Sequence, residues 1–191
     1  MNSHLRVRAR LAARCLAAGG VVAYPTEGVW GLGCDPFNSA AVQRLQRIKG
    51  RSPDKAFILV AAATDQLASL LAPLSQAQRE QLDATWPGPL TWIIPDPTGV
   101  VPWWVKGSNE TIAVRVSAHP WVAALCRAYG GPLVSTSANR SGQPPVRSRW
   151  QLQREFRGDI DHVFAGPLGG ARGPSEIRDL ATGRVLRARG G

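Results

Sequence analysis

The chain has 191 residues, 44% of them hydrophobic, which suits one compact domain and leaves little room for a second. An excess of lysine and arginine, 23 residues against 13 aspartates and glutamates, gives a formal net charge of +10 and favours polyanionic partners. The three cysteines are odd in number, far apart and never arranged as CxxC. This supports neither a disulfide framework nor a zinc site, and we expect reduced thiols in a cytosolic protein.

The N-terminal residues predict a helix and then a buried strand. Four arginines precede the first acidic residue, Glu27, as in an organellar presequence. Near-helical spacing of four other residues favours a first helix of the domain instead: Leu5, Leu11, Cys15 and Leu16. Gly19 ends this helix before a strand at residues 21–24, and Gly31 and Gly33 are expected to be turn residues.

The middle of the chain predicts helices alternating with strands. Three helices are expected, each opened by a capping hydroxyl residue: Ser39 to Gly50, Thr64 to Leu71, and Ser75 to Trp86. Three strands are expected at residues 56–61, 90–94 and 111–116. The segment between the last two is rich in proline and tryptophan, and we expect it, with Trp103 and Trp104, to form a mobile flap.

The last third of the sequence completes the fold prediction. A helix from Pro120 to Gly130 precedes a strand at residues 132–136 and a polar loop at residues 137–143. Three more strands are expected in the arginine-rich remainder, at residues 163–165, 177–180 and 185–187. Strands that alternate with helices predict an α/β fold, and the crowded late strands indicate a mixed sheet. Ligands of such folds bind where loops leave the strand ends.

The positive charge has two interpretations that composition does not separate. Twenty of the 23 cationic residues are arginines, and only Lys49, Lys55 and Lys106 are lysines. The bias is typical of a solvated surface and equally compatible with a basic groove that binds an anion. No apolar run approaches the roughly 18 residues of a membrane span, so we expect no membrane partner.

Two loops offer polar groups early in the chain. The loop at residues 25–28 carries the hydroxyl of Thr26 and the carboxylate of Glu27, but it has neither a dinucleotide fingerprint nor a Walker A sequence. By local pattern alone, an ordinary turn is favoured over a binding site. In the second loop, Lys49 suits a phosphate oxygen and the fork of Arg51 suits a second oxygen, although a helix C-terminus favours cations in any case.

Polar residues also follow the strand at residues 132–136. Ser135, Ser137 and Asn139 can bind a polar ligand, or they can form turns and caps. Arg115 stands among apolar residues in the strand at 111–116, so it either faces solvent by alternation or points into a groove to meet an anion. The common hydrolase motifs are missing, and the three histidines have no metal-ligand spacing.

Six segments, taken together and in order, resemble the threonylcarbamoyl-AMP synthase family, also called the YrdC or TsaC family. They cover nearly the whole chain: YPTEGVWGLGCDP at 24–36, KGR at 49–51, WPGPLT at 86–91, TIAVRVSAHP at 111–120, PLVSTSANRSG at 132–142 and PSEIRDLATG at 174–183. The resemblance implies a twisted, largely mixed or antiparallel α/β sheet with flanking helices around a broad basic groove. Residues 1–191 would form one such domain, as in the short bacterial members.

The resemblance also implies a reaction. L-Threonine and bicarbonate would form a carbamate whose oxygen attacks the α-phosphate of ATP and expels pyrophosphate, with Mg²⁺ carried in by ATP. The threonylcarbamoyl-AMP formed would pass to a tRNA-modifying transferase complex in the cytoplasm. The site must neutralise two anions that react with each other, and positioning with electrostatics can suffice for that.

Carried over residue by residue, the resemblance assigns roles to ten positions. Lys49 and Arg51 would hold the phosphates and carry catalysis. Five more residues would complete the ATP site: Thr111, Ser137, Asn139, Ser175 and Arg187. Three would bind threonine: Thr26, Arg115 and Ser135. Val60 and Pro145 depart from the longer members, which have a histidine and often a serine at these positions.

Two alternatives remain. One is a non-enzymatic module that binds double-stranded RNA or tRNA through phosphate contacts. The other is the related domain of hydrogenase-maturation carbamoyltransferases, which is weakened because this chain lacks their paired CxxC motifs and acylphosphatase region.

Overall fold

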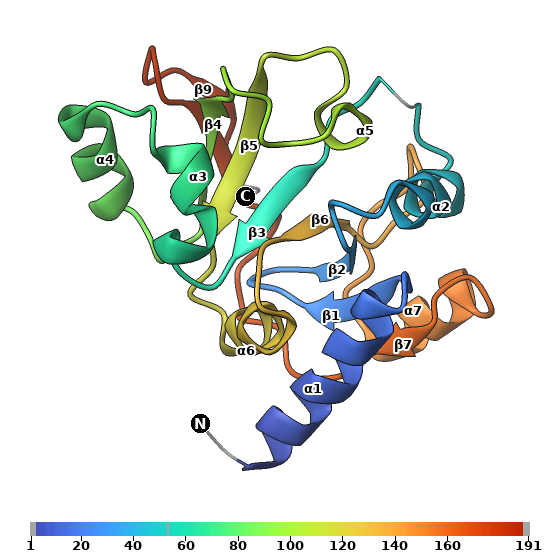
Figure 1. Cartoon of the computed structure of the whole chain (residues 1–191). Helices are drawn as coiled ribbons and strands as arrows, with labels where there is room; N and C mark the ends of the chain where they lie inside the picture. Colours follow the sequence, from blue (N-terminus) through green and yellow to red (C-terminus); the bar gives the residue numbers. More distant parts are fainter. Residues whose placement is uncertain (1–2, 53, 189–191) are drawn as a thin grey trace.

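A computed structural model describes residues 3–52 and 54–188 of the chain, and the structural statements below concern these residues. It contains nine strands: β1 (Val22–Pro25), β2 (Trp30–Cys34), β3 (Ile58–Ala61), β4 (Leu90–Pro95), β5 (Thr111–Val116), β6 (Leu133–Ser137), β7 (His162–Val163), β8 (Glu176–Asp179) and β9 (Val185–Arg187). They form one sheet in the order β7-β1-β2-β6-β3-β5-β4-β8-β9 (Figure 1). Three neighbouring pairs are parallel, β1 with β7, β3 with β5 and β4 with β8, and the others are antiparallel. The predicted mixed α/β sheet is confirmed.

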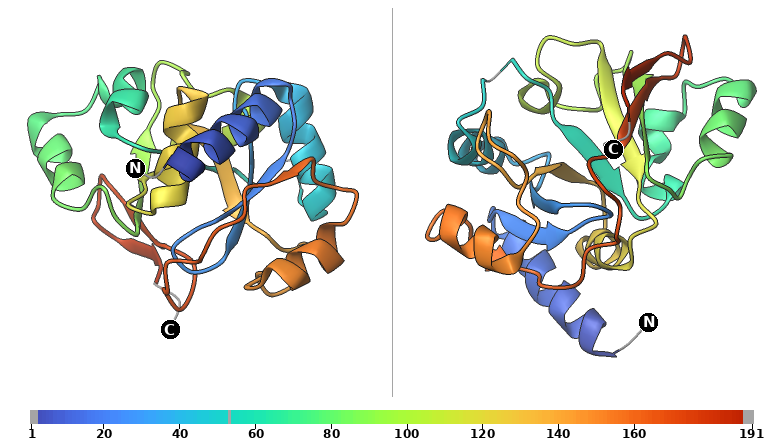
Figure 2. Two further views of the ribbon diagram at one scale, coloured as in Figure 1. Left: turned by 90° about the horizontal axis from the view of Figure 1, so that it is seen from below. Right: turned by 180° about the vertical axis from the view of Figure 1, so that it is seen from behind.

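The helices cover both faces of this sheet. They are α1 (Ser3–Ala17), α2 (Ser39–Lys49), the 3₁₀ helix η1 (Thr64–Leu67), α3 (Ala68–Leu71), α4 (Gln76–Asp83), α5 (Trp103–Lys106), α6 (Pro120–Tyr129) and α7 (Arg149–Phe156). Figure 2 shows α1 and α6 lying side by side against one face. The remaining helices bury their apolar residues on the other face. In the described part of the chain, no helix has the length and apolar character that crossing a membrane requires.

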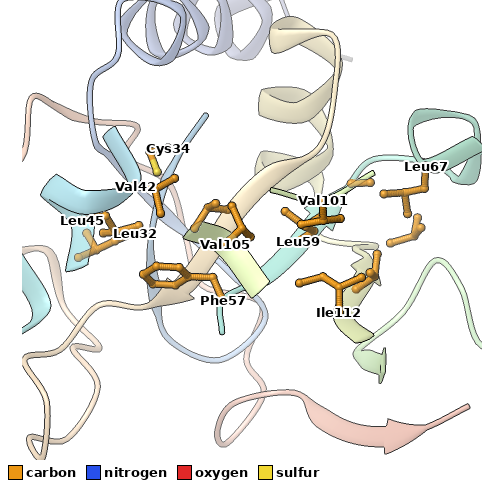
Figure 3. Packing of buried hydrophobic residues seen from close by; sticks show 14 of the residues in the cluster. Leu32, Cys34, Val42, Leu45, Phe57, Leu59, Leu67, Val101, Val105 and Ile112 are labelled. Atoms are coloured by element: carbon orange, nitrogen blue, oxygen red, sulfur yellow. The ribbon is translucent and has the colours of Figure 1, made fainter. Parts of the chain in front are cut away.

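Alternation along the strands divides the buried residues into two cores. In β5, Ile112, Val114 and Val116 point into the larger core, part of which Figure 3 shows. Consecutive residues of a strand point to opposite faces, so Thr111 and Arg115 lie on the face that carries α1 and α6. These two helices cover only part of that face, and the remainder is available for a ligand.

The helix ends follow the predicted capping rules, with two corrections. Ser75 caps α4 through a reciprocal pair of hydrogen bonds with Gln78, and Gly50 ends α2 in the left-handed conformation at φ 57°. The predicted cap at Ser39 was one residue late, because the Asn38 side chain accepts the hydrogen bond from the backbone N–H of Ala41. The predicted cap at Thr64 was wrong, since η1 begins there without a capping hydrogen bond from a side chain.

Gly31 and Gly33 were predicted to be turn residues, and this was wrong because both lie within β2. A Cβ atom on Gly33 would stand 2.4 Å from the carbonyl oxygen of Val134 and 2.9 Å from the Tyr24 ring. Glycine is therefore required by close packing of neighbours and not by a turn.

The segment rich in proline and tryptophan packs against the larger core and does not extend as a separate flap. Val101 and Val105 are buried, and the Trp104 indole N–H donates to the carbonyl oxygen of Pro36 at 3.0 Å. Lys106 forms an ion pair with the buried carboxylate of Asp96 at 2.7 Å. The apolar side chains of this segment anchor it to the larger core.

The topology requires one long crossing near the C-terminus. β7 is at one edge of the sheet and β8 is next to the opposite edge, so residues 164–175, here called the crossing segment, must pass over the sheet between them (Figure 2). The backbone N–H groups of Gly169 and Ala171 donate to the carbonyl oxygens of Thr26 and Glu27, at 3.0 and 2.7 Å. The crossing segment therefore rests on the loop between β1 and β2.

Candidate active site

A cavity of about 340 Å³ opens on the part of the sheet that α1 and α6 leave uncovered. Its floor is a row of residues in register across neighbouring strands, in which Ile58 of β3 stands between Ala113 of β5 and Ser135 of β6. Eight of the ten residues assigned from the sequence line this cavity: Thr26, Arg51, Thr111, Arg115, Ser135, Ser137, Ser175 and Arg187. The sheet thus brings together loops that are far apart along the chain.

Arg115 points into the cavity, which decides between the two orientations that the sequence allowed. Its side chain is 9% exposed and forms an ion pair with Glu27 at 3.1 Å. The Ser117 hydroxyl donates to the other Glu27 oxygen at 2.6 Å. The Nε of Arg115 is buried without a hydrogen-bond partner in the described residues, so this donor is not used there.

Lys49 lies behind the cavity wall, and its ammonium group is turned toward the loop that follows β6. Its Nζ donates to the carbonyl oxygens of Ser137 at 2.6 Å and Asn139 at 2.7 Å, with the Asn139 Oδ1 at 3.4 Å. Burial, with a smaller effect of the nearby Arg51 charge, lowers the pKa of Lys49 to about 8. Lys49 therefore holds the polar loop in place in this structure.

Asn139 likewise makes its contacts within that loop. Its Oδ1 accepts the hydrogen bond of the Ser137 hydroxyl at 2.6 Å, and its Nδ2 donates to the carbonyl oxygens of Arg140 and Gln143. Of these residues only Ser137 lines the cavity, so Lys49 and Asn139 support it from behind.

Two arginines on the cavity wall have no carboxylate partner among the residues that the structure describes. The guanidinium of Arg51 donates to the carbonyl oxygens of Lys55 and Ala56 and stacks on the Phe57 ring, 4.9 Å from its centroid. Burial lowers the pKa of Arg51. Arg187 of β9 donates to the carbonyl oxygen of Ser175, whose hydroxyl lies 2.8 Å from that of Thr91.

Sequence reasoning missed the residues that support this site. Glu27 was recognised as a loop carboxylate but not assigned to the site, and Ser117 was not considered. A usable signal existed, because a buried arginine needs a counter-charge and Glu27 adjoins Thr26. The described residues hold no cluster of three His, Cys, Asp or Glu side chains that could bind a metal ion.

A mixed α/β sheet with an arginine-lined cavity on one face, built from these loops, defines a YrdC-like protein. The Sua5/YciO/YrdC family model, described as "Telomere recombination", matches residues 14–191, and the chain belongs to this family.

Curated relatives and a solved structure agree with this membership. The threonylcarbamoyl-AMP synthase of Nitrosococcus oceani is 54% identical over 180 residues, covering 94% of this chain and 97% of that protein. The protein of the same name from Cellvibrio japonicus is 48% identical over 183 residues, covering 96% of each. The crystal structure of P. abyssi Sua5 complexed with L-threonine is 33% identical with a TM-score of 0.88. It matches 95% of this chain, which spans only 54% of the P. abyssi chain.

Proposed function

We propose that this protein is a threonylcarbamoyl-AMP synthase, which makes threonylcarbamoyl-AMP and pyrophosphate from L-threonine, bicarbonate and ATP. The observation that carries the proposal is the placement of three arginines in one cavity: Arg115 in its sheet floor, Arg51 on one wall and Arg187 on another. A site that joins an amino acid to a nucleotide must hold a carboxylate and a chain of phosphates at the same time. Guanidinium groups suit both.

The cavity residues divide between the two substrates. Arg115 would pair with the threonine carboxylate, and the hydroxyls of Thr26 and Ser135 would meet its polar groups. Arg51 and Arg187 would hold the phosphates. Thr111, Ser137 and Ser175 offer hydroxyls to the nucleotide from the same cavity, and Lys49 with Asn139 keeps Ser137 in position.

The reaction needs no covalent step on the protein. Threonine and bicarbonate form a carbamate with loss of water, and a carbamate oxygen then attacks the α-phosphorus of ATP. A new P–O bond forms while the bond to the β-phosphate oxygen breaks, and pyrophosphate leaves with the electron pair. The arginines offset the repulsion between the two anions and hold them in line, while Mg²⁺ enters with ATP as part of the substrate.

The relatives support this proposal by name, because the curated matches of similar length are threonylcarbamoyl-AMP synthases. The P. abyssi Sua5 structure contains L-threonine, which fits an amino acid in this cavity. We further propose that the product passes to a separate transferase complex that modifies tRNA, and that this takes place in the cytoplasm.

Mass spectrometry of the pure protein mixed with ATP, Mg²⁺, threonine and bicarbonate tests the proposal. We expect threonylcarbamoyl-AMP and an equivalent of pyrophosphate, neither of which forms without threonine. Lys49→Ala should abolish both, because the loop that carries Ser137 loses its buried donor. A wild-type protein that forms no adenylate under these conditions is not this enzyme, and carbamoyl phosphate consumption would indicate the carbamoyltransferase alternative.

The second candidate function is RNA binding without catalysis. The formal charge of +10 favours it, because each arginine that binds a phosphate releases counterions. The two functions differ in what they require of Lys49. Its buried ammonium has no access to an RNA phosphate, so Lys49→Ala should lower RNA retention only slightly.

A further inference from the structure

The cations around the cavity differ in their counter-charge. Arg115 is paired with the carboxylate of Glu27 at 3.1 Å. Arg51 and Arg187 contact backbone carbonyls and a hydroxyl, and within residues 3–52 and 54–188 neither forms an ion pair with a carboxylate. The cavity therefore has one arginine whose charge is offset by a carboxylate, Arg115, and two whose charge is not, Arg51 and Arg187.

Glu27 is fixed behind Arg115 and is not among the residues that line the cavity. Its side chain is 15% exposed and accepts the Ser117 hydroxyl at 2.6 Å, while the Ser117 oxygen also accepts from the backbone N–H of His119 at 3.1 Å. The Glu27 carbonyl oxygen accepts from the backbone N–H of Ala171 in the crossing segment. Glu27 consequently acts on a ligand through Arg115 and through its charge.

This charge distribution discriminates between the two kinds of substrate. A phosphate chain is attracted to Arg51 and Arg187, but at Arg115 it meets a cation already neutralised by the Glu27 carboxylate, which repels it. Free threonine, which must bind before the carbamate forms, brings an ammonium with its carboxylate, so the Glu27 carboxylate costs its binding little. Both substrates share a cavity of about 340 Å³, so the threonine carboxylate and the ATP phosphates must bind different arginines if the carbamate is to face the α-phosphorus.

We propose that Glu27 is a positioning and specificity-determining residue that reserves Arg115 for the amino acid and excludes phosphate groups from it. The inference rests on the proposed synthase function. It adds the residue that keeps the phosphates of ATP away from the arginine that pairs with threonine.

Glu27→Gln tests this, because it keeps the shape of the side chain and removes its charge. Inorganic pyrophosphate is the probe, titrated calorimetrically and used as an inhibitor. In the wild-type protein we expect it to leave the apparent KM for threonine unchanged. In Glu27→Gln it should become competitive with threonine and bind about tenfold more tightly, since the repulsion at Arg115 is gone.

Asp161→Asn is the matched control. It removes a carboxylate that pairs with Arg44 at 2.6 Å and accepts a backbone N–H from Val21 at 2.7 Å, at the edge of the sheet away from the cavity. Glu27→Gln and Asp161→Asn each remove one negative charge, so the net charge of the protein is the same in both variants. The control should leave pyrophosphate noncompetitive with threonine.

The outcomes separate the possible roles. Pyrophosphate that stays noncompetitive in a folded Glu27→Gln protein overturns the inference. A lower Tm with equal rises in KM for threonine and ATP means that Glu27 only stabilises the fold, and it also overturns the inference. If Glu27→Gln does not fold, Glu27→Asp keeps the charge and should leave pyrophosphate noncompetitive with threonine. Competition in that variant would show that the shape of the side chain and not its charge excludes pyrophosphate, which overturns the inference. A wild-type protein without threonine-dependent pyrophosphate release refutes the proposed function. The calorimetric affinities of wild type and Glu27→Gln for pyrophosphate can still be compared in that case, and their ratio tests the effect of the Glu27 charge.

Discussion

At the scale of single residues, the ammonium of Lys49 illustrates how an assigned role changes when its neighbours are known. Sequence resemblance assigned it to the phosphates, whereas its donors are directed to Ser137 and Asn139. Ser137 ends β6 and Asn139 lies in the loop after it, so Lys49 joins the end of α2 to the start of this loop. A second hydrogen bond connects the same two segments, because the backbone N–H of Ser141 donates to the Lys49 carbonyl oxygen at 2.7 Å.

The lowered pKa of Lys49 predicts that activity and stability change in opposite directions with pH. Lys49 loses its proton near pH 8 in the folded protein, so kcat should fall as pH rises through this value and the loop loses a donor. The unfolded chain keeps the proton up to the usual pKa of 10.5 and binds more protons across this window. The contribution of Lys49 to the free energy of unfolding should therefore rise with pH between these values.

Pairing kcat with urea unfolding from pH 7 to about pH 10, for wild type and Lys49→Met, isolates this group. Only the difference between the two proteins reports Lys49, because other groups titrate in both. A wild-type kcat that stays level through pH 9, or a wild-type free energy of unfolding that falls relative to that of Lys49→Met as pH rises, would contradict the assignment.

At the scale of elements, the crossing segment connects the cavity residues Thr26 and Ser175. It rests on the loop that carries Thr26 and Glu27, and its last residue is Ser175 on the cavity wall. Gly28 makes this approach possible, since a Cβ atom there would lie 2.3 Å from the carbonyl oxygen of Gly173. That neighbour is backbone, so it cannot move without displacing the segment.

Gly28→Ala should therefore weaken ATP binding from a distance. Displacing the crossing segment moves Ser175, and we expect KM for ATP to rise by roughly tenfold and stability to fall by about 1–3 kcal/mol. Steady-state kinetics and thermal unfolding measure the two effects. Gly131→Ala serves as control, because its Cβ atom would meet only the Tyr129 ring at 3.8 Å and should change neither. Equal kinetics in Gly28→Ala and wild type would show that the segment does not position the nucleotide site.

Elements with local signals were predictable, and contacts between distant segments were not. The strand at residues 111–116 was predicted with its observed bounds, because its apolar residues alternate and turn signals flank it. α7 was missed although Ser148 caps it reciprocally with Gln151, as Ser75 caps α4 with Gln78. The need of Arg115 for a counter-charge was a usable signal, but its geometry with Glu27 depends on how β5 lies relative to the loop after β1, which no local pattern specifies.

At the scale of the whole molecule, the positive charge is not confined to the cavity. Arg6, Arg10 and Arg14 follow each other at intervals of four on the exposed side of α1, and Arg149, Arg154 and Arg157 lie in or next to α7. Neither group lines the cavity. Much of the charge excess thus lies on the surface, which agrees with the interpretation of the arginine bias as a solvated surface.

This distribution predicts that RNA retention and catalysis can be separated. Replacing Arg6, Arg10 and Arg14 with glutamine should weaken RNA binding and reduce the slope of log K against log salt by about one for each phosphate that is no longer bound. Threonine-dependent pyrophosphate release should stay unchanged, because these residues are remote from the cavity floor. Filter binding over a series of salt concentrations measures the slope, and Arg51→Ala is the complementary variant, with release abolished and the slope nearly kept. If the triple variant instead binds RNA as the wild type does while Arg51→Ala does not, RNA occupies the cavity itself, and the arginines of α1 serve only solubility.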